Sequence, residues 1–183
     1  FSMFQVPFYR ANISRWGDHK KRVMSKLYKN LDGYIEKHEC MTSFYSGMND
    51  LDLSLKLFKP FLDFINPDLN ELRKVESMSG GYPMPDITGI WYQSYTKQQY
   101  HQLHNHGAVG WSAVFYATFD KKEHRATRFY CPFPDVSGQT IGYEPDVDEG
   151  TLIVFPSYLQ HEARYTLSDK KRSIISFNMC PYK

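Results

Sequence analysis

The chain has 183 residues, which is enough for one domain with a full core and short for two. Its 42% hydrophobic and 23% charged residues are ordinary for a soluble globular protein, and a net charge of +2 implies no strong electrostatic partner, so a nucleic-acid partner is only weakly supported. No apolar run approaches the ~18–20 residues that a membrane span needs, which argues against a membrane protein.

Residues 1–76 are predicted to form a mainly helical support region. Asp18 is expected to cap the first helix, and Asp32-Gly33 to end it. The second helix is expected to end at Asn66-Pro67, because the residue before a proline avoids the helical conformation. The elements predicted in this region are a short strand or arm at 4–10 and helices at 19–31, 55–65 and 69–75.

Residues 77–183 are predicted to form a jelly-roll core, after a glycine- and proline-rich loop at about 77–85. Short apolar runs between Gly, Pro and Asp turns predict strands at 90–95, 111–119, 126–130, 151–155 and 173–178. We therefore expect a mainly β fold in a single domain, 1–183, whose N-terminal helices brace one sheet. The other side of the roll should stay open as the mouth of a site, where Tyr82, Trp91 and Trp111 are candidates if they do not pack in the core.

Three histidines predict a metal site, and we expect them to be its catalytic group. His104 and His106 are two residues apart in an extended segment, so their side chains should point to the same side. His161 follows an apolar strand and a turn, where the end of a strand meets a cavity. Three imidazoles with open positions suit ferrous iron and zinc alike. His101, three residues before His104, should point to the other face and support the site without binding the metal.

Arg172 predicts a site for a carboxylate, because its planar guanidinium can pair with both oxygens, which lysine cannot do. In an extended segment Ser176 shares its face, and if His161 and Arg172 come from adjacent antiparallel strands, both project into one cavity. Tyr95 and Tyr116 lie on strands that flank the histidine pair, and an inward phenol could donate to the same carboxylate, although core packing is a competing role.

Cysteine usage and the first residues favour a cytoplasmic protein. Cys40, Cys131 and Cys180 lie far apart without a CxxC pair, which favours reduced thiols. The opening FSMFQVPFYR lacks the charged-then-apolar layout of a signal peptide.

Two segments of the C-terminal half resemble the Fe(II)/2-oxoglutarate-dependent oxygenases, and most closely the small prolyl-hydroxylase-like branch of bacteria and tailed phages. They are WYQSYTKQQYHQLHNHGAVGWSAVFYATFD and EGTLIVFPSYLQHEARYTLSDKKRSIISFN, within residues 90–178. The resemblance implies a double-stranded β-helix, which is a jelly roll with N-terminal helices behind its larger sheet. It also implies a bacterial or phage-encoded protein.

By this resemblance His104 and His161 are the first and last iron ligands, and Arg172 binds the distal carboxylate of 2-oxoglutarate with help from Tyr95 and Tyr116. The middle ligand of the family is usually Asp or Glu, and His106 stands there instead. This HxH form resembles the same branch. The exchange raises the net charge of the site by one, which disfavours the higher oxidation states of iron unless neighbouring groups compensate.

The implied activity is hydroxylation of a substrate with Fe(II), O2 and 2-oxoglutarate, releasing succinate and CO2. A prolyl residue of a protein is the leading candidate substrate by resemblance alone, and a small molecule stays open. Two alternatives remain: a zinc-dependent hydrolase or hydratase that uses the three histidines, and a non-catalytic metal-binding jelly-roll module. The sequence does not indicate the oligomeric state.

Overall fold

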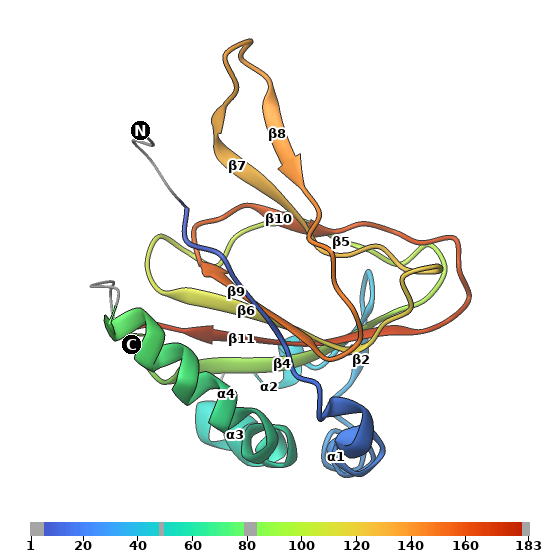
Figure 1. The fold of residues 1–183 in the computed structure, drawn as a ribbon. Helices are drawn as coiled ribbons and strands as arrows, with labels where there is room; N and C mark the ends of the chain where they lie inside the picture. Colours follow the sequence, from blue (N-terminus) through green and yellow to red (C-terminus); the bar gives the residue numbers. More distant parts are fainter. Residues whose placement is uncertain (1–5, 48–49, 79–83, 181–183) are drawn as a thin grey trace.

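The computed structural model describes residues 6–47, 50–78 and 84–180 (Figure 1). Its helices are α1 (Trp16–Asn30), α2 (Phe44–Gly47), α3 (Leu51–Leu57) and α4 (Lys59–Met78). Its strands are β1 (Tyr9–Asn12), β2 (Glu36–Lys37), β3 (Met41–Thr42), β4 (Ile87–Tyr95), β5 (His101–His104), β6 (Trp111–Thr118), β7 (Arg128–Pro134), β8 (Thr140–Tyr143), β9 (Thr151–Pro156), β10 (His161–Ala163) and β11 (Arg172–Met179).

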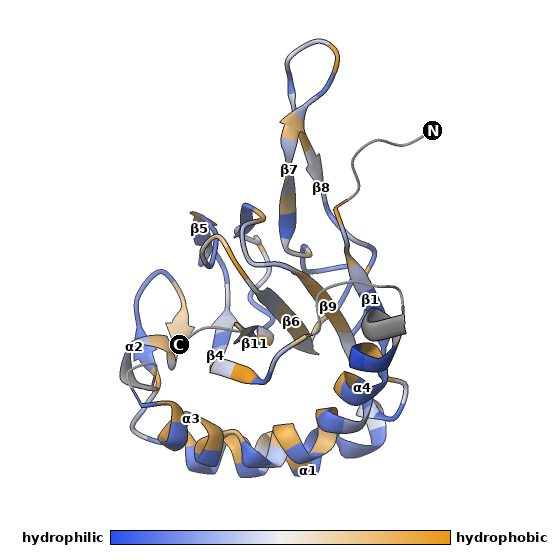
Figure 2. Ribbon diagram, turned by 90° about the vertical axis from the view of Figure 1, so that its left-hand side faces the viewer, coloured by the Kyte–Doolittle hydropathy of each residue, from blue (hydrophilic) through white to orange (hydrophobic). Residues whose placement is uncertain are grey.

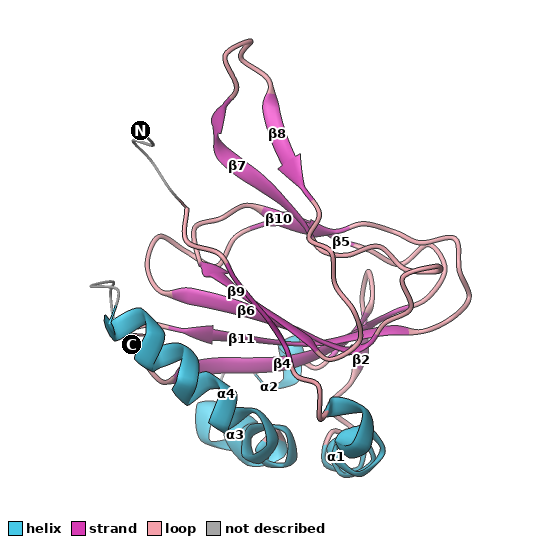
Figure 3. Cartoon of the chain, in the orientation of Figure 1, coloured by secondary structure: helices cyan, strands magenta, loops and turns pink. Residues whose placement is uncertain are grey.

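The strands form two antiparallel sheets that face each other (Figure 3). The larger sheet has the order β1-β9-β6-β11-β4-β3-β2, and the smaller one β5-β10-β7-β8. The helices lie against the outer face of the larger sheet, and the β7–β8 hairpin projects away from the opposite side (Figures 1 and 2). This is the double-stranded β-helix that the sequence predicted. No helix within the described residues is long and apolar enough to cross a membrane.

The larger sheet is apolar on both faces, because it separates two cores. Side chains alternate along a strand, so Ile175 of β11 packs on the helix side and Ile174 packs between the sheets. On β4, Tyr92 likewise packs on the helix side and Tyr95 packs between the sheets. This double burial explains why the two strands are almost continuously apolar or small in sequence.

The predicted cap of the first helix is wrong. The helix α1 begins at Trp16, so Asp18 lies inside its first turn, and Arg15 occupies the N-cap position without a side-chain capping bond. Trp16 is buried, and its Nε1 donates to the carbonyl of Ala117 at 3.1 Å. Packing of this indole on β6 therefore determines where the helix starts. Asp18 still favours the helix, since a negative charge near the N-terminus interacts with the helix dipole.

The predicted break at Asn66-Pro67 is also wrong, because α4 runs through Pro67 and absorbs the third predicted helix. Proline removes one backbone hydrogen bond there and normally destabilises a helix interior. Arg15 braces the helix on both sides of the proline, donating to the carbonyl of Phe64 and pairing with Asp68. The actual break between helices falls at Phe58, which caps α3.

Several short strands were not predicted. The strands β2 and β3 have two residues each, and β8 is exposed along its whole length, so none of them carries a run of buried alternating residues. The predicted strand at 126–130 begins two residues later and extends to Pro134. Residues 4–5 of the predicted arm and 79–83 of the predicted loop lie outside the described residues.

Candidate metal centre

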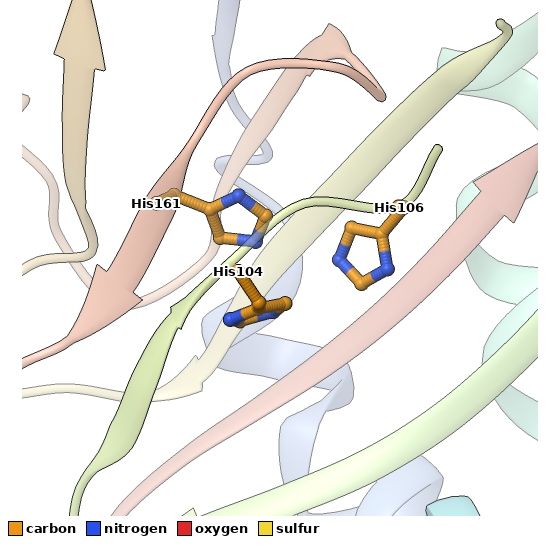
Figure 4. A group of neighbouring side chains, drawn as sticks. All are labelled: His104, His106 and His161. Carbon is orange, nitrogen blue, oxygen red and sulfur yellow. The ribbon is translucent and has the colours of Figure 1, made fainter. Parts of the chain in front are cut away.

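Three histidines lie close together (Figure 4). They line a cavity whose other lining residues come from both sheets. His104 ends β5, His106 lies in the loop that follows, and His161 begins β10. Because β5 and β10 pair with His104 opposite His161, these two rings are 4.3 Å apart. Each of the three residues offers a nitrogen within 4.8 Å of the others, a spacing that one metal ion can bridge.

The position of His106 depends on a loop. The strand ends at His104, so the expected strand alternation does not continue to His106. Instead, its backbone N–H donates to the carbonyl of Ser157 at 2.8 Å, which ties this loop to the turn between β9 and β10. Gly107 follows with a φ of +103°, a conformation that favours glycine and lets the chain turn at once.

The imidazoles of the cluster are held in their neutral form. Burial lowers the pKa of His161 well below its ordinary value, and it lowers the pKa of His106 to about 3. The pKa of His104 is lowered by the same cause. Neutral imidazole has a free lone pair, which is the form that binds a metal.

Hydrogen bonds orient two of the rings. Nδ1 of His104 donates to the carbonyl of Gln102 at 2.7 Å, and Nδ1 of His161 donates to the carbonyl of Leu159 at 2.9 Å. In each ring the proton is then on Nδ1, and Nε2 keeps its lone pair for a metal.

His101 lies on the same side as His104, so the expectation that it points to the other face is wrong. It borders the same cavity and accepts a hydrogen bond at Nδ1 from Nε2 of Gln93, at 2.9 Å. The pairing between β5 and β10 is irregular at this point. A bulge of this kind changes which residues of a strand share a face.

Arg172 is a buried cation without an anion. Its side chain is 2% exposed, and it stacks over the ring of Tyr95 with 4.3 Å between the guanidinium carbon and the ring centroid. Nη1 donates to the carbonyl of Arg125, while Nε and Nη2 find no partner among the described residues. An unpaired buried charge is costly, so these two groups are suited to a carboxylate.

Arg172 and His161 lie in different sheets. The condition of adjacent strands that the sequence left open is not met, because Arg172 begins β11 of the larger sheet and β10 belongs to the smaller one. Tyr95 is the register partner of Arg172 on β4 and borders the same inner cavity as His161. The cavity therefore reaches from the histidines to Tyr95, over whose ring the guanidinium stacks.

Of the other predicted cosubstrate residues, Tyr95 and Ser176 line this cavity and Tyr116 does not. The hydroxyl of Tyr95 is buried without a partner among the described residues, and burial raises its pKa well above the ordinary value, so it stays protonated as a donor. The hydroxyl of Tyr116 accepts a hydrogen bond from the backbone N–H of Thr127 at 3.0 Å. Ser176 borders the cavity. That these residues bind a cosubstrate stays a prediction.

Trp111 and Trp91, both candidates for the mouth of the site, lie in different parts of the fold. Trp111 packs in the core on the helix side, and Trp91 borders the histidine cluster, with its ring 5.4 Å from that of His106. Tyr82 lies outside the described residues. Sequence reasoning missed Gln93, whose place next to His101 depends on how β4 faces β5 across the cavity.

Residues 89–178 match the family described as "Putative 2OG-Fe(II) oxygenase". The likeness to the Fe(II)/2-oxoglutarate-dependent oxygenases that the sequence predicted is therefore confirmed for this part of the chain, which is just under half of its length. The matched segment contains all three histidines of the cluster and Arg172. A search of curated proteins finds no match.

Solved structures with a similar fold include two prolyl hydroxylases. A prolyl-4-hydroxylase from Pseudomonas putida has a TM-score of 0.57 at 12% identity, covering 96% of this chain and 94% of the other. The prolyl hydroxylase of Trichoplax adhaerens, in complex with a peptide of the hypoxia inducible factor oxygen degradation domain, has a TM-score of 0.60 at 12% identity, covering 94% and 83%.

The epimerase SnoN of nogalamycin biosynthesis, in complex with Fe3+, α-ketoglutarate and nogalamycin RO, is also similar. It has a TM-score of 0.69 at 9% identity, covering 96% of this chain and 79% of the other. At these identities the likeness shows a shared double-stranded β-helix, and it does not show a shared substrate.

Proposed function

We propose that this protein is a hydroxylase in which His104, His106 and His161 hold Fe(II) and Arg172 binds the distal carboxylate of 2-oxoglutarate. The observation that carries the proposal is a cluster of three neutral imidazoles on a cavity that also reaches Tyr95, over whose ring the buried guanidinium of Arg172 stacks with two N–H groups unpaired among the described residues. When bound, iron and 2-oxoglutarate would supply O2-dependent hydroxylation of a C–H bond, with release of succinate and CO2.

The chain's own residues would bind and orient these groups. Two N–H groups of Arg172 can pair with both oxygens of one carboxylate, and the protonated hydroxyl of Tyr95 can donate to it. Ser176 would support the same ligand from β11. Tyr116 lies next to them, with its hydroxyl anchored to Thr127.

Binding of the dicarboxylate would require a local opening. The inner cavity has a volume of about 20 Å³, enough for a water molecule. The side chains around it must therefore move apart when the ligand enters. Val114 and Ile174 are two aliphatic residues of its lining, and they can change rotamer without losing a hydrogen bond.

The neutral ligand set has an electrostatic consequence. His106 takes the place of the usual carboxylate, so the protein contributes no negative charge to the site. The charges of Fe(II) and doubly ionised 2-oxoglutarate would then cancel, and the guanidinium of Arg172 would leave the site with a net charge of +1. We therefore expect the two to bind cooperatively, since each compensates the charge of the other.

We propose a prolyl residue of a peptide as the leading substrate, supported by the two prolyl hydroxylases with the same fold. The nogalamycin epimerase with this fold supports a small molecule as the alternative. We further expect the whole chain, 1–183, to act as one oxygenase domain in the cytoplasm, with 1–76 as its helical support.

The test is turnover of 2-oxoglutarate. Protein reconstituted with Fe(II) under anaerobic conditions should bind 2-oxoglutarate and release succinate when O2 is admitted. The matched control is Arg172→Met, which should keep the metal and lose the 2-oxoglutarate. Absence of both 2-oxoglutarate binding and succinate release in the wild-type protein would refute the proposal. A zinc hydrolase, the first alternative, requires no role for Arg172.

A further inference from the structure

A second pocket, of about 150 Å³, opens beside the histidine cluster. Its outer wall comes from β3, α2 and the preceding Glu39 and Cys40, and its inner wall from β4 and β5. Trp91, Gln93 and three histidines border both this pocket and the inner cavity, so the two spaces adjoin at the cluster. The three shared histidines are His101, His104 and His106.

One wall of the outer pocket is a chain of aromatic rings. Phe44 meets Tyr45 edge to face at 5.2 Å and meets Trp91 in the same way at 5.3 Å. Trp91 then lies 5.4 Å from His106. An apolar group held on this wall would therefore lie directly beside the candidate metal ligands.

The charges around the pocket argue against an acidic ligand. Among the described residues, no lysine or arginine lines it, and Glu39 is the single acid in its lining. The remaining polar groups at the rim include the amides of Gln102 and Asn105, both exposed. With the charge of the metal cancelled by 2-oxoglutarate, a carboxylate bound here would face Glu39 without a lysine or arginine among the described lining residues to compensate it, whereas an uncharged amide group would meet matching donors and acceptors.

Trp91 adds a specific hydrogen-bond donor. Its side chain is 2% exposed, and its Nε1 has no acceptor among the described residues. Trp16, equally buried, donates to a backbone carbonyl instead. A buried donor without an acceptor costs about 1–3 kcal/mol, so its retention in a residue that lines a pocket points to an acceptor that arrives with a ligand. Nε1 is closed to solvent in this structure, so the side chains that cover it must move when that acceptor enters.

We propose that the outer pocket binds an uncharged acyl-amide group of the substrate, as found in a peptide, and that Nε1 of Trp91 donates to its carbonyl oxygen. The aromatic wall of Phe44, Tyr45 and Trp91 receives the adjoining side chain. The hydrogen bond fixes how deeply the side chain of the substrate enters the pocket beside His106. This inference rests on the proposed function and selects peptides over free amino acids, whose carboxylate the pocket disfavours.

The test uses nuclear magnetic resonance of the tryptophan indole N–H groups in 15N-labelled protein. Zn(II) replaces Fe(II) because it is diamagnetic and has no redox chemistry, and 2-oxoglutarate is present. The probes are the N-acetyl amides of proline, valine and lysine, and the same three free amino acids. The three indole signals are assigned with Trp→Phe variants of Trp16, Trp91 and Trp111.

At least one N-acetyl amide should move the Trp91 indole proton downfield, leave the Trp16 and Trp111 signals in place, and bind more tightly than its free amino acid. Trp91→Phe should weaken this binding about tenfold, or about 1.4 kcal/mol, whereas Trp111→Phe in the other core should not. If no amide moves the Trp91 signal, or the free acids move it equally, the inference is wrong.

The 2-oxoglutarate titration separates the two failures. If 2-oxoglutarate binds and the amides leave Trp91 unmoved, only the pocket assignment fails. If 2-oxoglutarate does not bind, the proposed function fails first.

Discussion

The imidazole rings of His101 and His104 are stacked, with centroids 4.1 Å apart and planes inclined by 21°. His101 pairs with Ala163 and His104 with His161, so β5 takes three residue steps where β10 takes two. The extra residue turns both rings to the same side. Nδ1 of His101 accepts from Gln93, which leaves its proton on Nε2 and no lone pair free for a metal. We infer that His101 positions His104 and does not bind the metal.

Replacing His101 tests this role. His101→Ala should leave one metal ion bound per chain and weaken its affinity about tenfold, as is common for groups that orient a ligand. His101→Phe retains the stacking and should recover most of the affinity. Metal titration followed by elemental analysis measures both quantities. Loss of the metal in His101→Phe as well would mean that the ring is itself a ligand.

Replacing Arg172 should have opposite effects on 2-oxoglutarate affinity and on thermal stability. Removing one partner of a buried ion pair typically costs 2–5 kcal/mol, so Arg172→Met should weaken 2-oxoglutarate binding by about 100-fold or more. In the absence of ligand the same change removes an unpaired buried charge, and the variant should unfold at the same or a higher temperature than the wild type. Calorimetric titration and thermal melting are the measurements. A destabilised variant with intact 2-oxoglutarate affinity would show a purely structural arginine.

Metal binding should tolerate a carboxylate at position 106 better than an apolar side chain. His106→Asp restores the ligand type usual in the family and lowers the site charge by one, so it should retain Fe(II) and lose it to oxidation in air faster than the wild type. His106→Ala leaves two of the three clustered imidazoles and should bind the metal at least tenfold more weakly. Anaerobic titration and the rate of ferric absorbance in air measure these effects. Equal affinity in wild type and His106→Ala would exclude His106 as a ligand.

Stability should fall at alkaline pH through Cys40, which is 3% exposed beside the outer pocket. Burial raises the pKa of its thiol from 9.0 to about 11. Between these values the unfolded chain loses a proton that the folded chain keeps, so rising pH favours unfolding. The contribution of the protonated thiol to the free energy of unfolding is complete below pH 9 and is lost as the pH rises toward 11.

Cys40→Ala should therefore flatten the fall of the free energy of unfolding above pH 9, measured by urea denaturation at several pH values. Tyr28→Phe is a useful comparison, because the pKa of Tyr28 is raised to about 12 and its effect begins one unit higher, above pH 10. An unchanged slope in Cys40→Ala would show that its thiol ionises alike in the folded and unfolded chain.

Local patterns in the sequence were sufficient for the fold class and for the three histidines that the structure brings together. The apolar segments at 90–95 and 173–178 became β4 and β11, because burial on both faces leaves a continuous apolar run. Residue type and spacing were enough to single out His104, His106, His161 and Arg172. Few other roles require these side chains in that order.

Only the tertiary structure decided how these residues are arranged. Strand pairing is non-local, so neither the bulge that turns His101 toward the cavity nor the placement of His161 and Arg172 on facing sheets follows from spacing along the chain. The unpaired Nε1 of Trp91 has the same origin, because whether a buried donor finds an acceptor depends on every element packed around it.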